Sequence, residues 1–488
     1  MEESSRGGML EEPRTFWAVA LLIALLCAVT NLPWQLDDYD QAKQAFTSFE
    51  MVEAGHWLYQ HTPNERIATK PPLVGWISAA LYGVGRSWEL AWRLPSAAAA
   101  LLLAIALTRA GGVAYGRAAA LLALSAFGLN LLAPRLATLV RTDMPLALVV
   151  FLLGLQIWEK VRTGSAWTTR DRVLAFLLLT AAMLVKGPIV YAFLLPGIAL
   201  YQLHARQWRT AGSAWSGWWP WLASLAIFLA WAAAGIAWMP GFYEQVVVKE
   251  FAGRFGETVH RPQPLYFYLP HLLHKFAPWS VLLIAFGIVG WRSEHISLRE
   301  RARRLSPDVV WLLVWSLGGL LVMSLIPSKR VDRVFPIVPP LCLLLALQLA
   351  RTPFPKQARR WAGIAILFAC LFTSAYAAQR VILSYRAGDA ALADFGRIVR
   401  QEAAAHSWRY EVIGGKEEGV LLYLRRTHFL KPPEAAESWK AGLLDAIVAP
   451  AEEAPELLRA LPGAVLTGVE ASVLIDKQAR RYVLLKRG

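Results

Sequence analysis

The sequence predicts an all-α protein that crosses a membrane many times, followed by a small α/β domain. Of the 488 residues, 56% are hydrophobic and 17% are charged, whereas about a quarter of an average soluble domain is charged. Apolar runs recur from Phe16 to Ala378, and their length of roughly 15–20 residues suits a hydrocarbon core about 30 Å thick. These runs stop after Arg386. We therefore expect a transmembrane domain over 1–384 and a second domain over 385–488.

About 11 transmembrane helices are predicted, and as many as 13 would fit the pattern. The expected crossings lie near 16–33, 94–108, 118–133, 144–160, 173–186, 188–203, 218–239, 277–291, 307–326, 334–350 and 361–380. Segment 71–84 is short and begins with two prolines, so we expect it to be re-entrant or half of a paired crossing. The first run follows a tail without a clear signal-peptide pattern, and we expect it to be retained.

The positions of the basic residues predict which loops face the cytoplasm. These residues gather in alternate loops, at Arg109 and Arg117, Lys160 to Arg172, Arg206 and Arg209, Arg292 to Arg304, and Arg351 to Arg360. Such loops mark the cytoplasmic side. Loops 34–70, 134–143, 186–188, 240–276 and 327–333 would then face outward, as would the C-terminal domain. We expect a multi-pass protein of the cytoplasmic (inner) membrane.

The same loops account for the net charge of +15, so no nucleic-acid partner is expected. Cys27, Cys342 and Cys370 all lie inside apolar runs. This placement argues against a disulfide or zinc framework built on cysteine.

The last hundred residues predict a small α/β domain. Leu392, Phe395, Ile398 and Val399 recur at helical spacing within 389–404. Strand-like runs are expected at 410–413, 420–424, 446–449, 472–475 and 482–485, and a second helix at 453–461. The domain should be long enough for its own core. It holds no nucleotide-binding loop and no metal-spaced His/Cys set, so a lid or docking role is expected.

Loop 34–70 carries the first candidate residues. Asp37, Asp38 and Asp40 follow the end of the first apolar run, where a carboxylate could accept a proton from an attacking hydroxyl. The simpler alternative is that three acids solvate the start of a loop. Lys70 precedes Pro71-Pro72, which hold it at the interface at the depth of a lipid phosphate. It could instead be a snorkelling anchor.

Other outward loops add charges to the same face. Arg141 and Asp143 lie between two apolar runs, where ionisable residues are costly and tend to be functional; a structural ion pair is the alternative. The remaining cations are Lys186, Lys329, Arg330 and Arg333. His260 and Arg261 belong to a loop that could cover a substrate or form an interfacial aromatic belt.

Taken in order, these motifs resemble polyprenyl-phosphate-dependent GT-C glycosyltransferases of the dolichyl-phosphate-mannose–protein mannosyltransferase-like superfamily, nearest the bacterial aminoarabinose-transferase-like branch. The matching motifs, within about residues 15–350, are Tyr39-Asp40-Gln41-Ala42, Glu50-Met51, Gly55-His56-Trp57, Lys70-Pro71-Pro72-Leu73 with Trp76, Arg93-Leu94-Pro95, Arg141 with Asp143, Lys186-Gly187-Pro188, Pro278-Trp279, and Ser328-Lys329-Arg330 with Pro336 and Pro339-Pro340.

The resemblance implies transfer of a sugar from a polyprenyl-phosphate donor to a lipid, glycan or protein acceptor, with inversion. It implies that Asp40 is the catalytic aspartate, that Asp143 is the second one, and that Lys70 lies near the lipid phosphate. Arg141, Lys329, Arg330 and Arg333 suit binding of the donor phosphate. Asp37, Asp38, His260 and Arg261 belong to possible substrate loops.

The sequence departs from that branch in two places. The branch carries a glutamate zinc ligand directly before the lysine, where this chain has Thr69, and a usually acidic position holds Gln41. No cofactor is therefore assigned. A divalent metal stays open, but the missing carboxylate weakens zinc and a lipid A acceptor.

Two other functions fit parts of the pattern. A lipid-linked glycan polymerase or ligase would also have large outer loops and basic residues. A lipid or solute transporter would place polar residues near the bilayer midplane and show repeated halves, whereas here the polar residues cluster at the outer ends of the spans.

Overall fold

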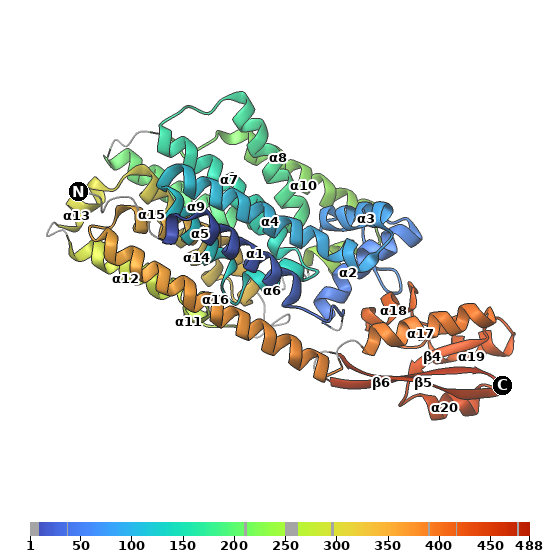
Figure 1. Cartoon of the computed structure of the whole chain (residues 1–488). Helices are drawn as coiled ribbons and strands as arrows, with labels where there is room; N and C mark the ends of the chain where they lie inside the picture. The colour runs from blue at the N-terminus through green and yellow to red at the C-terminus, as the bar shows by residue number, and fades with distance from the viewer. Residues whose placement is uncertain are drawn as a thin grey trace.

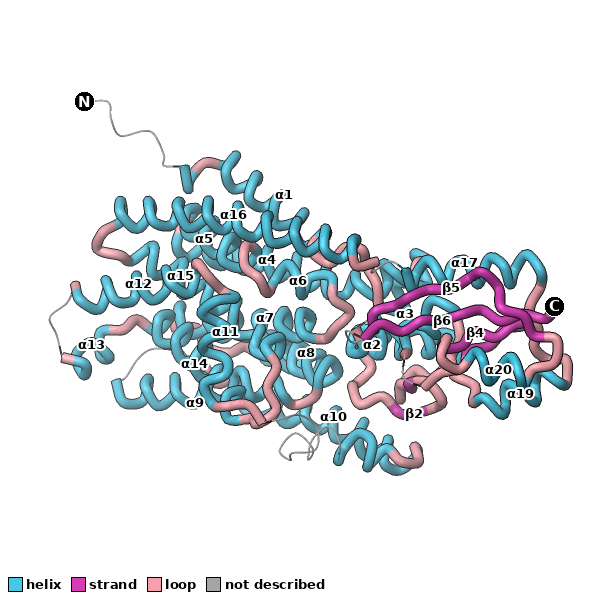
Figure 2. The backbone as a smooth tube through the Cα atoms, turned by 90° about the horizontal axis from the view of Figure 1, so that it is seen from below, coloured by secondary structure: helices cyan, strands magenta, loops and turns pink. Residues whose placement is uncertain are grey.

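The computed structural model describes residues 9–36, 38–208, 212–248, 262–293, 297–388, 391–415, 417–475 and 478–488. A bundle of helices accounts for the chain up to Arg386, and a small α/β region follows it. Figure 1 shows that this region lies at one end of the bundle, beside α2 and α3, and that α13 lies at the opposite end. The tube in Figure 2, seen from below, gives the same arrangement.

The bundle follows the expected order of apolar runs. Its helices are α1 (Pro13–Val29), α2 (Tyr39–Ala54), α3 (Leu73–Gly85), α4 (Trp88–Tyr115), α5 (Arg117–Gly128), α6 (Ala133–Thr138), α7 (Asp143–Thr163), α8 (Thr169–Lys186), α9 (Ile189–Trp208), α10 (Trp218–Trp238), α11 (Tyr268–Lys275), α12 (Trp279–Arg292), α13 (Leu298–Arg304), α14 (Pro307–Leu325), η5 (Val331–Ile337), α15 (Val338–Arg351) and α16 (Pro355–Arg386). A short hairpin, β1 (His61–Thr62) and β2 (Arg66–Ile67), joins α2 to α3.

Six helical segments of the described chain are long and apolar enough to cross a membrane, and the α11–α12 pair, bent by 100°, allows a seventh. Every one of the eleven expected crossings coincides with a helix, but some of these, such as α1 and α5, are shorter than a full span. The higher count therefore stays a prediction. The segment after Pro71-Pro72 is a helix of 13 residues, short for a crossing as expected.

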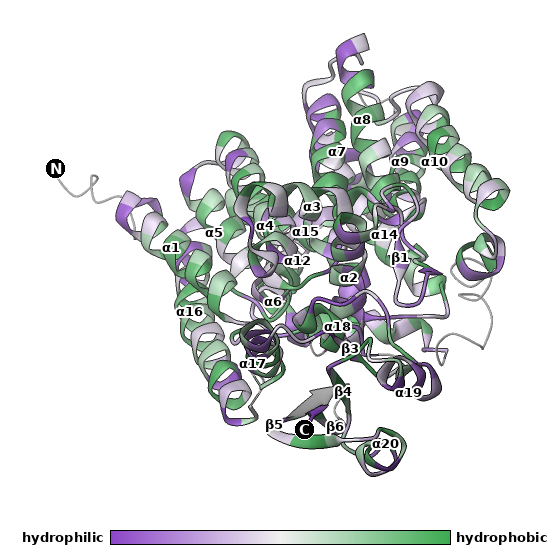
Figure 3. Ribbon diagram, turned by 90° about the vertical axis from the view of Figure 1, so that its right-hand side faces the viewer, coloured by the Kyte–Doolittle hydropathy of each residue, from purple (hydrophilic) through white to green (hydrophobic). Residues whose placement is uncertain are grey.

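The outer faces of the long helices are apolar. Trp17, Leu101, Leu229, Leu321 and Leu371 each expose more than half of their surface, and Figure 3 shows hydrophobic colour along the helices. A soluble protein seldom leaves such a large apolar surface uncovered, because exposed patches of this kind drive association. The surface suits contact with lipid chains.

The C-terminal region contains a four-stranded sheet with the order β3-β4-β6-β5. Its strands are β3 (Tyr410–Val412), β4 (Ala446–Pro450), β5 (Ala464–Ile475) and β6 (Gln478–Arg487), and its helices are α17 (Ala391–His406), α18 (Glu418–Leu424), α19 (Pro432–Lys440) and α20 (Ala454–Ala460). Strands β3 and β4 are parallel, and the other pairs are antiparallel. This confirms an α/β fold, the helices expected at 389–404 and 453–461, and four of the five expected strands.

The prediction of a strand at 420–424 is wrong, because these residues belong to helix α18. A short apolar run has no period that separates a buried strand from a buried helix. Here all seven residues of α18 are buried, so contacts from neighbouring elements decide its conformation. Helix α19 was not expected from the sequence.

The two faces of the C-terminal sheet have different partners. Along β4, Ile447 and Ala449 pack with α19 and α20 in a core that belongs to this region alone. Ala446 and Val448 join a second core, which also contains Phe46 of α2. The expected independent core is thus present on one face, whereas the other face is shared with the helical bundle.

Candidate active site

Helix α2 presents the first candidate residue, Asp40, in its first turn. Asp38 caps the helix, because its Oδ1 accepts hydrogen bonds from the backbone N–H groups of Asp40 at 3.0 Å and Gln41 at 3.2 Å. Such a cap contributes about 1 kcal/mol. Gly55 ends the helix with a φ of 83°, which favours glycine. The cap fixes where α2 begins, and therefore where the Asp40 carboxylate lies.

The turn between α6 and α7 supplies Arg141. The hydroxyl of Ser96 donates to the backbone oxygens of Leu139 at 2.8 Å and Arg141 at 3.2 Å, and the N–H of Val140 donates to the side chain of Gln41 at 3.1 Å. These bonds tie the turn to α4 and to α2. They bring a residue about one hundred positions away in the chain to the side of Asp40.

Arg141 is a buried centre of ion pairs. Its Nη2 lies 3.0 Å from Asp38 Oδ2 and 3.7 Å from Asp40 Oδ2, and its Nη1 lies 3.0 Å from Asp332 Oδ2. Only 9% of the Arg141 side chain is exposed. A guanidinium with several fixed partners is held rigidly, so Arg141 sets the distance between α2 and the η5 segment.

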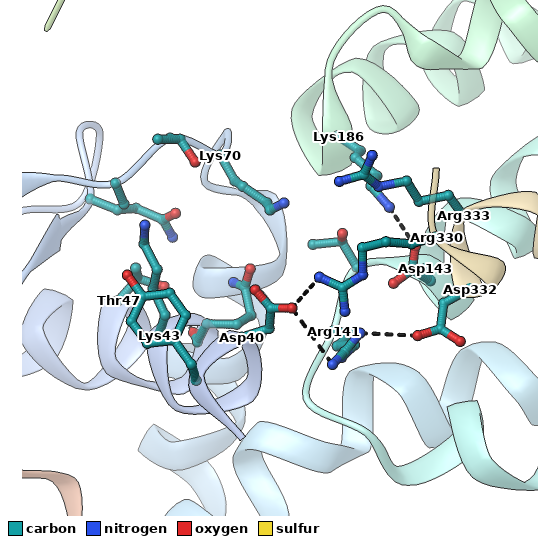
Figure 4. Close-up of a pocket in the computed structure, with 16 residues that line it drawn as sticks. Asp40, Lys43, Thr47, Lys70, Arg141, Asp143, Lys186, Arg330, Asp332 and Arg333 are labelled. Atoms are coloured by element: carbon teal, nitrogen blue, oxygen red, sulfur yellow. Dashed lines mark hydrogen bonds and ion pairs between the residues drawn. The ribbon is translucent and has the colours of Figure 1, made fainter. Parts of the chain in front are cut away.

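These elements enclose a pocket with a volume of about 130 Å³. It is lined by Tyr39, Asp40, Lys43, Gln44, Thr47, Gln60, Ala68, Thr69, Lys70, Arg141, Thr142, Asp143, Lys186, Arg330, Asp332 and Arg333. In Figure 4, Asp40, Lys43, Thr47 and Lys70 lie on one side of the pocket, and Asp143, Lys186, Arg330 and Arg333 lie on the other. Loops 34–70 and 134–143 therefore both contribute to one pocket. This agrees with the expectation that the two loops face the same side of the membrane.

The pocket is predominantly basic. Six lysine or arginine side chains line it against three carboxylates. Burial alone would raise the pKa of Asp40, but the hydrogen bond and charge of Arg330 lower it below its ordinary value, with smaller contributions from Arg141 and Lys70. The Asp40 carboxylate, whose side chain is 43% exposed, is therefore ionised at neutral pH. The site combines a proton acceptor with an excess of cations.

Asp143 has a different partner from the one considered in the sequence. Its carboxylate pairs with the ammonium of Lys186 at the end of α8, and both side chains are less than 10% exposed. Arg141 pairs instead with Asp38, Asp40 and Asp332. The suggested Arg141–Asp143 ion pair is therefore replaced by Lys186–Asp143, and Lys186 becomes part of the pocket wall.

Most of the expected site residues converge, with a few exceptions. Lys329 does not line the pocket, because its Nζ donates to the backbone oxygen of Gln263 at 2.9 Å. Asp38 acts as a helix cap and as a partner of Arg141. Asp37, His260 and Arg261 lie outside the described residues.

Sequence reasoning missed several residues of the pocket. Lys43 and Thr47 follow Asp40 by three and seven positions on α2, so helical spacing could have placed them on the same face. Asp332 lies within the Ser328–Arg333 segment, whose three cations gave no signal for an acidic member of the pocket. Gln60 carried no signal in the sequence.

The residues next to Lys70 do not fit the zinc ligands that the family resemblance implied. Thr69 offers a hydroxyl where a carboxylate ligand was expected, and hydroxyls are not among the usual zinc ligands. A separate group of metal-ligating side chains lies near the other end of α2, where Glu50, His56 and His61 come together.

Curated proteins that are similar to this chain include aminoarabinose transferases. No family model matches the chain. It is 28% identical over 330 residues to the undecaprenyl phosphate-alpha-4-amino-4-deoxy-L-arabinose arabinosyl transferase 1 of Sodalis glossinidius, covering 65% of this chain and 55% of that protein. The undecaprenyl phosphate-alpha-4-amino-4-deoxy-L-arabinose arabinosyl transferase of Shewanella sediminis is 26% identical over 353 residues. The match covers 71% of this chain and 61% of that protein. The chain thus spans about three fifths of the length of these relatives.

Solved structures share the fold over nearly the whole chain. ArnT from Cupriavidus metallidurans bound to undecaprenyl phosphate superposes with a TM-score of 0.67 at 18% identity, covering 96% of this chain and 97% of ArnT. The archaeal oligosaccharyltransferase AglB from Archaeoglobus fulgidus, in complex with an inhibitory peptide and a dolichol-phosphate, superposes with a TM-score of 0.51 at 12% identity. The match covers 90% of this chain and 70% of AglB. The chain is therefore a multi-pass membrane protein with the GT-C fold of ArnT, and it is similar in sequence to the undecaprenyl-phosphate aminoarabinose transferases.

Proposed function

We propose that this protein is a glycosyltransferase that moves a sugar from a polyprenyl-phosphate donor to an acceptor hydroxyl or phosphate. The observation that carries the proposal is the convergence of the Asp40 carboxylate with Lys70, Lys186, Arg330 and Arg333 around one pocket. A sugar bound to a lipid phosphate already has a good leaving group, so the site has two tasks. It must stabilise the departing phosphate and orient the acceptor.

The cations suit the first task. When the bond between the anomeric carbon and the phosphate oxygen breaks, the phosphodiester becomes a phosphate monoester and gains about one negative charge. Fixed donors placed where charge develops lower the barrier without reorganisation. The basic excess of the pocket meets this requirement, and the bound undecaprenyl phosphate of ArnT supports a lipid phosphate as the ligand.

Asp40 suits the second task. An ionised carboxylate accepts the proton of an acceptor hydroxyl as that oxygen attacks the anomeric carbon from the face opposite the phosphate. Attack from that face inverts the configuration. A phosphate acceptor would need no such proton transfer, and the acceptor, whether lipid, glycan or protein, stays open. A glycan polymerase or ligase remains the alternative within the same fold.

We further propose that the pocket opens to the outer face of the cytoplasmic membrane, with the C-terminal region outside the cytoplasm. Basic helix α13 lies at the end of the bundle opposite that region, and Lys/Arg excess favours the cytoplasmic side.

The test is mass spectrometry of lipid-linked sugars and glycoconjugates in a strain that lacks the gene. We expect a polyprenyl-phosphate sugar to accumulate and one glycoconjugate to lose a residue. The wild-type gene and a Glu53→Gln variant, which changes an exposed acid on α2, should restore the product. Asp40→Asn should insert normally and fail to restore it, with a loss of about 10²- to 10⁴-fold. Full restoration by Asp40→Asn would overturn the assignment of Asp40.

A further inference from the structure

The last turn of α2 and the following hairpin bring three potential metal ligands together. Glu50 lies in α2, His56 follows the Gly55 that ends the helix, and His61 opens β1. One ligand atom from each lies within 4.8 Å of the others. The imidazole rings of His56 and His61 are 4.1 Å apart between centroids, and His56 Nδ1 contacts Glu50 Oε1.

The group contains buried polar atoms without partners among the described residues. Glu50 and His61 are each 5% exposed. The backbone groups of His61 and Tyr59 lie close to the Glu50 carboxylate and the His61 ring, respectively, yet Glu50 Oε2 and His61 Nδ1 have no partner in good hydrogen-bond geometry. Leaving such an atom unsatisfied is unfavourable, and most buried polar atoms in folded proteins are satisfied. Two of them side by side, next to a third ligand, indicate that something absent from the polypeptide completes the group.

We propose that Glu50, His56 and His61 bind one divalent transition-metal ion of the zinc class, which ties the end of α2 to the hairpin that leads to Lys70. Two imidazole nitrogens and one carboxylate oxygen are a donor set that zinc accepts. Bond lengths of about 2.0–2.2 Å place tetrahedral ligands about 3.5 Å apart, so small side-chain rotations suffice. The fourth position would hold water, which can enter beside the partly exposed His56.

The site is placed to position the pocket. Gln60 precedes His61 and lines the pocket together with Lys70, and the backbone N–H of Ala68 donates to the oxygen of Gln60 at 2.7 Å. The metal ion would therefore fix the hairpin that holds Lys70 relative to the helix that holds Asp40. The ion acts through these residues and does not reach the reacting atoms.

The test measures metal content, so its outcome does not depend on sugar transfer. The full-length chain is purified in detergent, stripped with a chelator, loaded with Co²⁺ or Zn²⁺ and dialysed. We expect about one ion per chain and, for Co²⁺, visible absorption typical of a tetrahedral site. The variants His61→Ala and Glu50→Gln should lose the ion. His56→Ala should lose it too, and this variant changes a side chain that is 43% exposed, so it should still fold.

A matched control lies on α17, where Glu402 and His406 form an exposed pair 3.7 Å apart that the grouping of three ligands does not include. His406→Ala should keep the bound ion. Zinc should also raise the melting temperature of the wild-type protein and of His406→Ala, and leave that of His56→Ala unchanged. If the wild-type chain retains no ion, or if His56→Ala and His61→Ala retain it as the wild type does, the site does not exist.

Discussion

The carboxylate of Asp40 accepts a hydrogen bond from the guanidinium of Arg330, a residue 290 positions further along the chain. The same Asp40 oxygen lies 3.7 Å from Arg141. Two cations therefore hold the proposed proton acceptor in its ionised form and in one orientation. Because the contact joins α2 to the segment before η5, it also links two walls of the pocket.

The Asp40–Arg330 contact predicts a change in pH dependence. Because Arg330 lowers the pKa of Asp40, wild-type activity should persist as the pH falls, until the carboxylate protonates below its ordinary pKa of about 3.9. In Arg330→Gln the strongest interaction that opposes the effect of burial is lost, so the pKa of Asp40 should be higher than in the wild type. The acid limb of the pH–rate profile should then move to higher pH.

Arg333→Gln is the matched control, because the Arg333 guanidinium donates to Ser328. Its acid limb should stay close to that of the wild type, even if its overall rate falls. An acid limb that does not move in Arg330→Gln would contradict the assignment of that limb to Asp40.

Lys70 and Lys329 should behave differently, although both were expected to bind the donor phosphate. Lys70 lines the pocket, whereas Lys329 donates to Gln263 outside it. A charge-assisted hydrogen bond contributes about 1.5–3 kcal/mol, so Lys70→Ala should weaken binding of undecaprenyl phosphate about 10- to 150-fold. Lys329→Ala should leave that affinity nearly unchanged and lower the melting temperature. Equal losses of affinity would show that Lys329 also reaches the lipid phosphate.

The buried Asp143–Lys186 pair predicts strong coupling between its members. Lys186→Met leaves the carboxylate without its ammonium partner, which should cost about 3–5 kcal/mol. Asp143→Leu in the same chain should recover most of that loss of stability without restoring lipid-phosphate binding. Denaturation in detergent and ligand binding measure the two effects separately.

The exposed Arg304–Glu300 pair on α13 is the control for this cycle, since exposed pairs contribute about 1 kcal/mol or less. If Lys186→Met is no more destabilising than Arg304→Met, the buried pair has no structural role.

Gly419 on α18 predicts how the C-terminal region supports the pocket. A Cβ at this position would lie 2.3 Å from the backbone oxygen of Leu36, whereas one at the exposed Gly415 would meet nothing within 4 Å. Gly419→Ala should therefore displace α18 from the segment before α2 and lower both the melting temperature and activity. Gly415→Ala should alter neither. An unaffected Gly419→Ala variant would show that the contact with Leu36 is not needed.

The sequence was sufficient for the parts of the site that rest on local pattern. The end of the first apolar run indicated a group of three acids, and the family resemblance selected Asp40 among them. The prolines indicated Lys70, and polarity between two apolar runs indicated Arg141. Asp40, Lys70 and Arg141 all line the pocket. Their ordered spacing also indicated the fold class that the comparison with ArnT confirms.

Pairings between distant residues could not be predicted in this way. Nothing near Asp143 in the sequence distinguishes Lys186 from Arg141 as its partner, because the choice depends on how α7 packs against α8. The run at 420–424 likewise fits a strand or a helix until α2 covers it. Lys329 and Arg330 are neighbours in the chain, but only the direction of each side chain decides which one faces the pocket.

The core that α2 shares with the C-terminal region has a consequence for biogenesis. Leu36, just before α2, donates its backbone N–H to the hydroxyl of Tyr423, 387 residues later. At about 5–20 residues per second, a ribosome needs roughly 20 to 80 s to synthesise that interval. During this time α2 can pack against α4, as Phe49 does against Trp88, but it lacks the part of its core that the C-terminal region supplies. The pocket helix can reach its final packing only after nearly the whole protein has been synthesised and its last hundred residues have been delivered to the same side of the membrane.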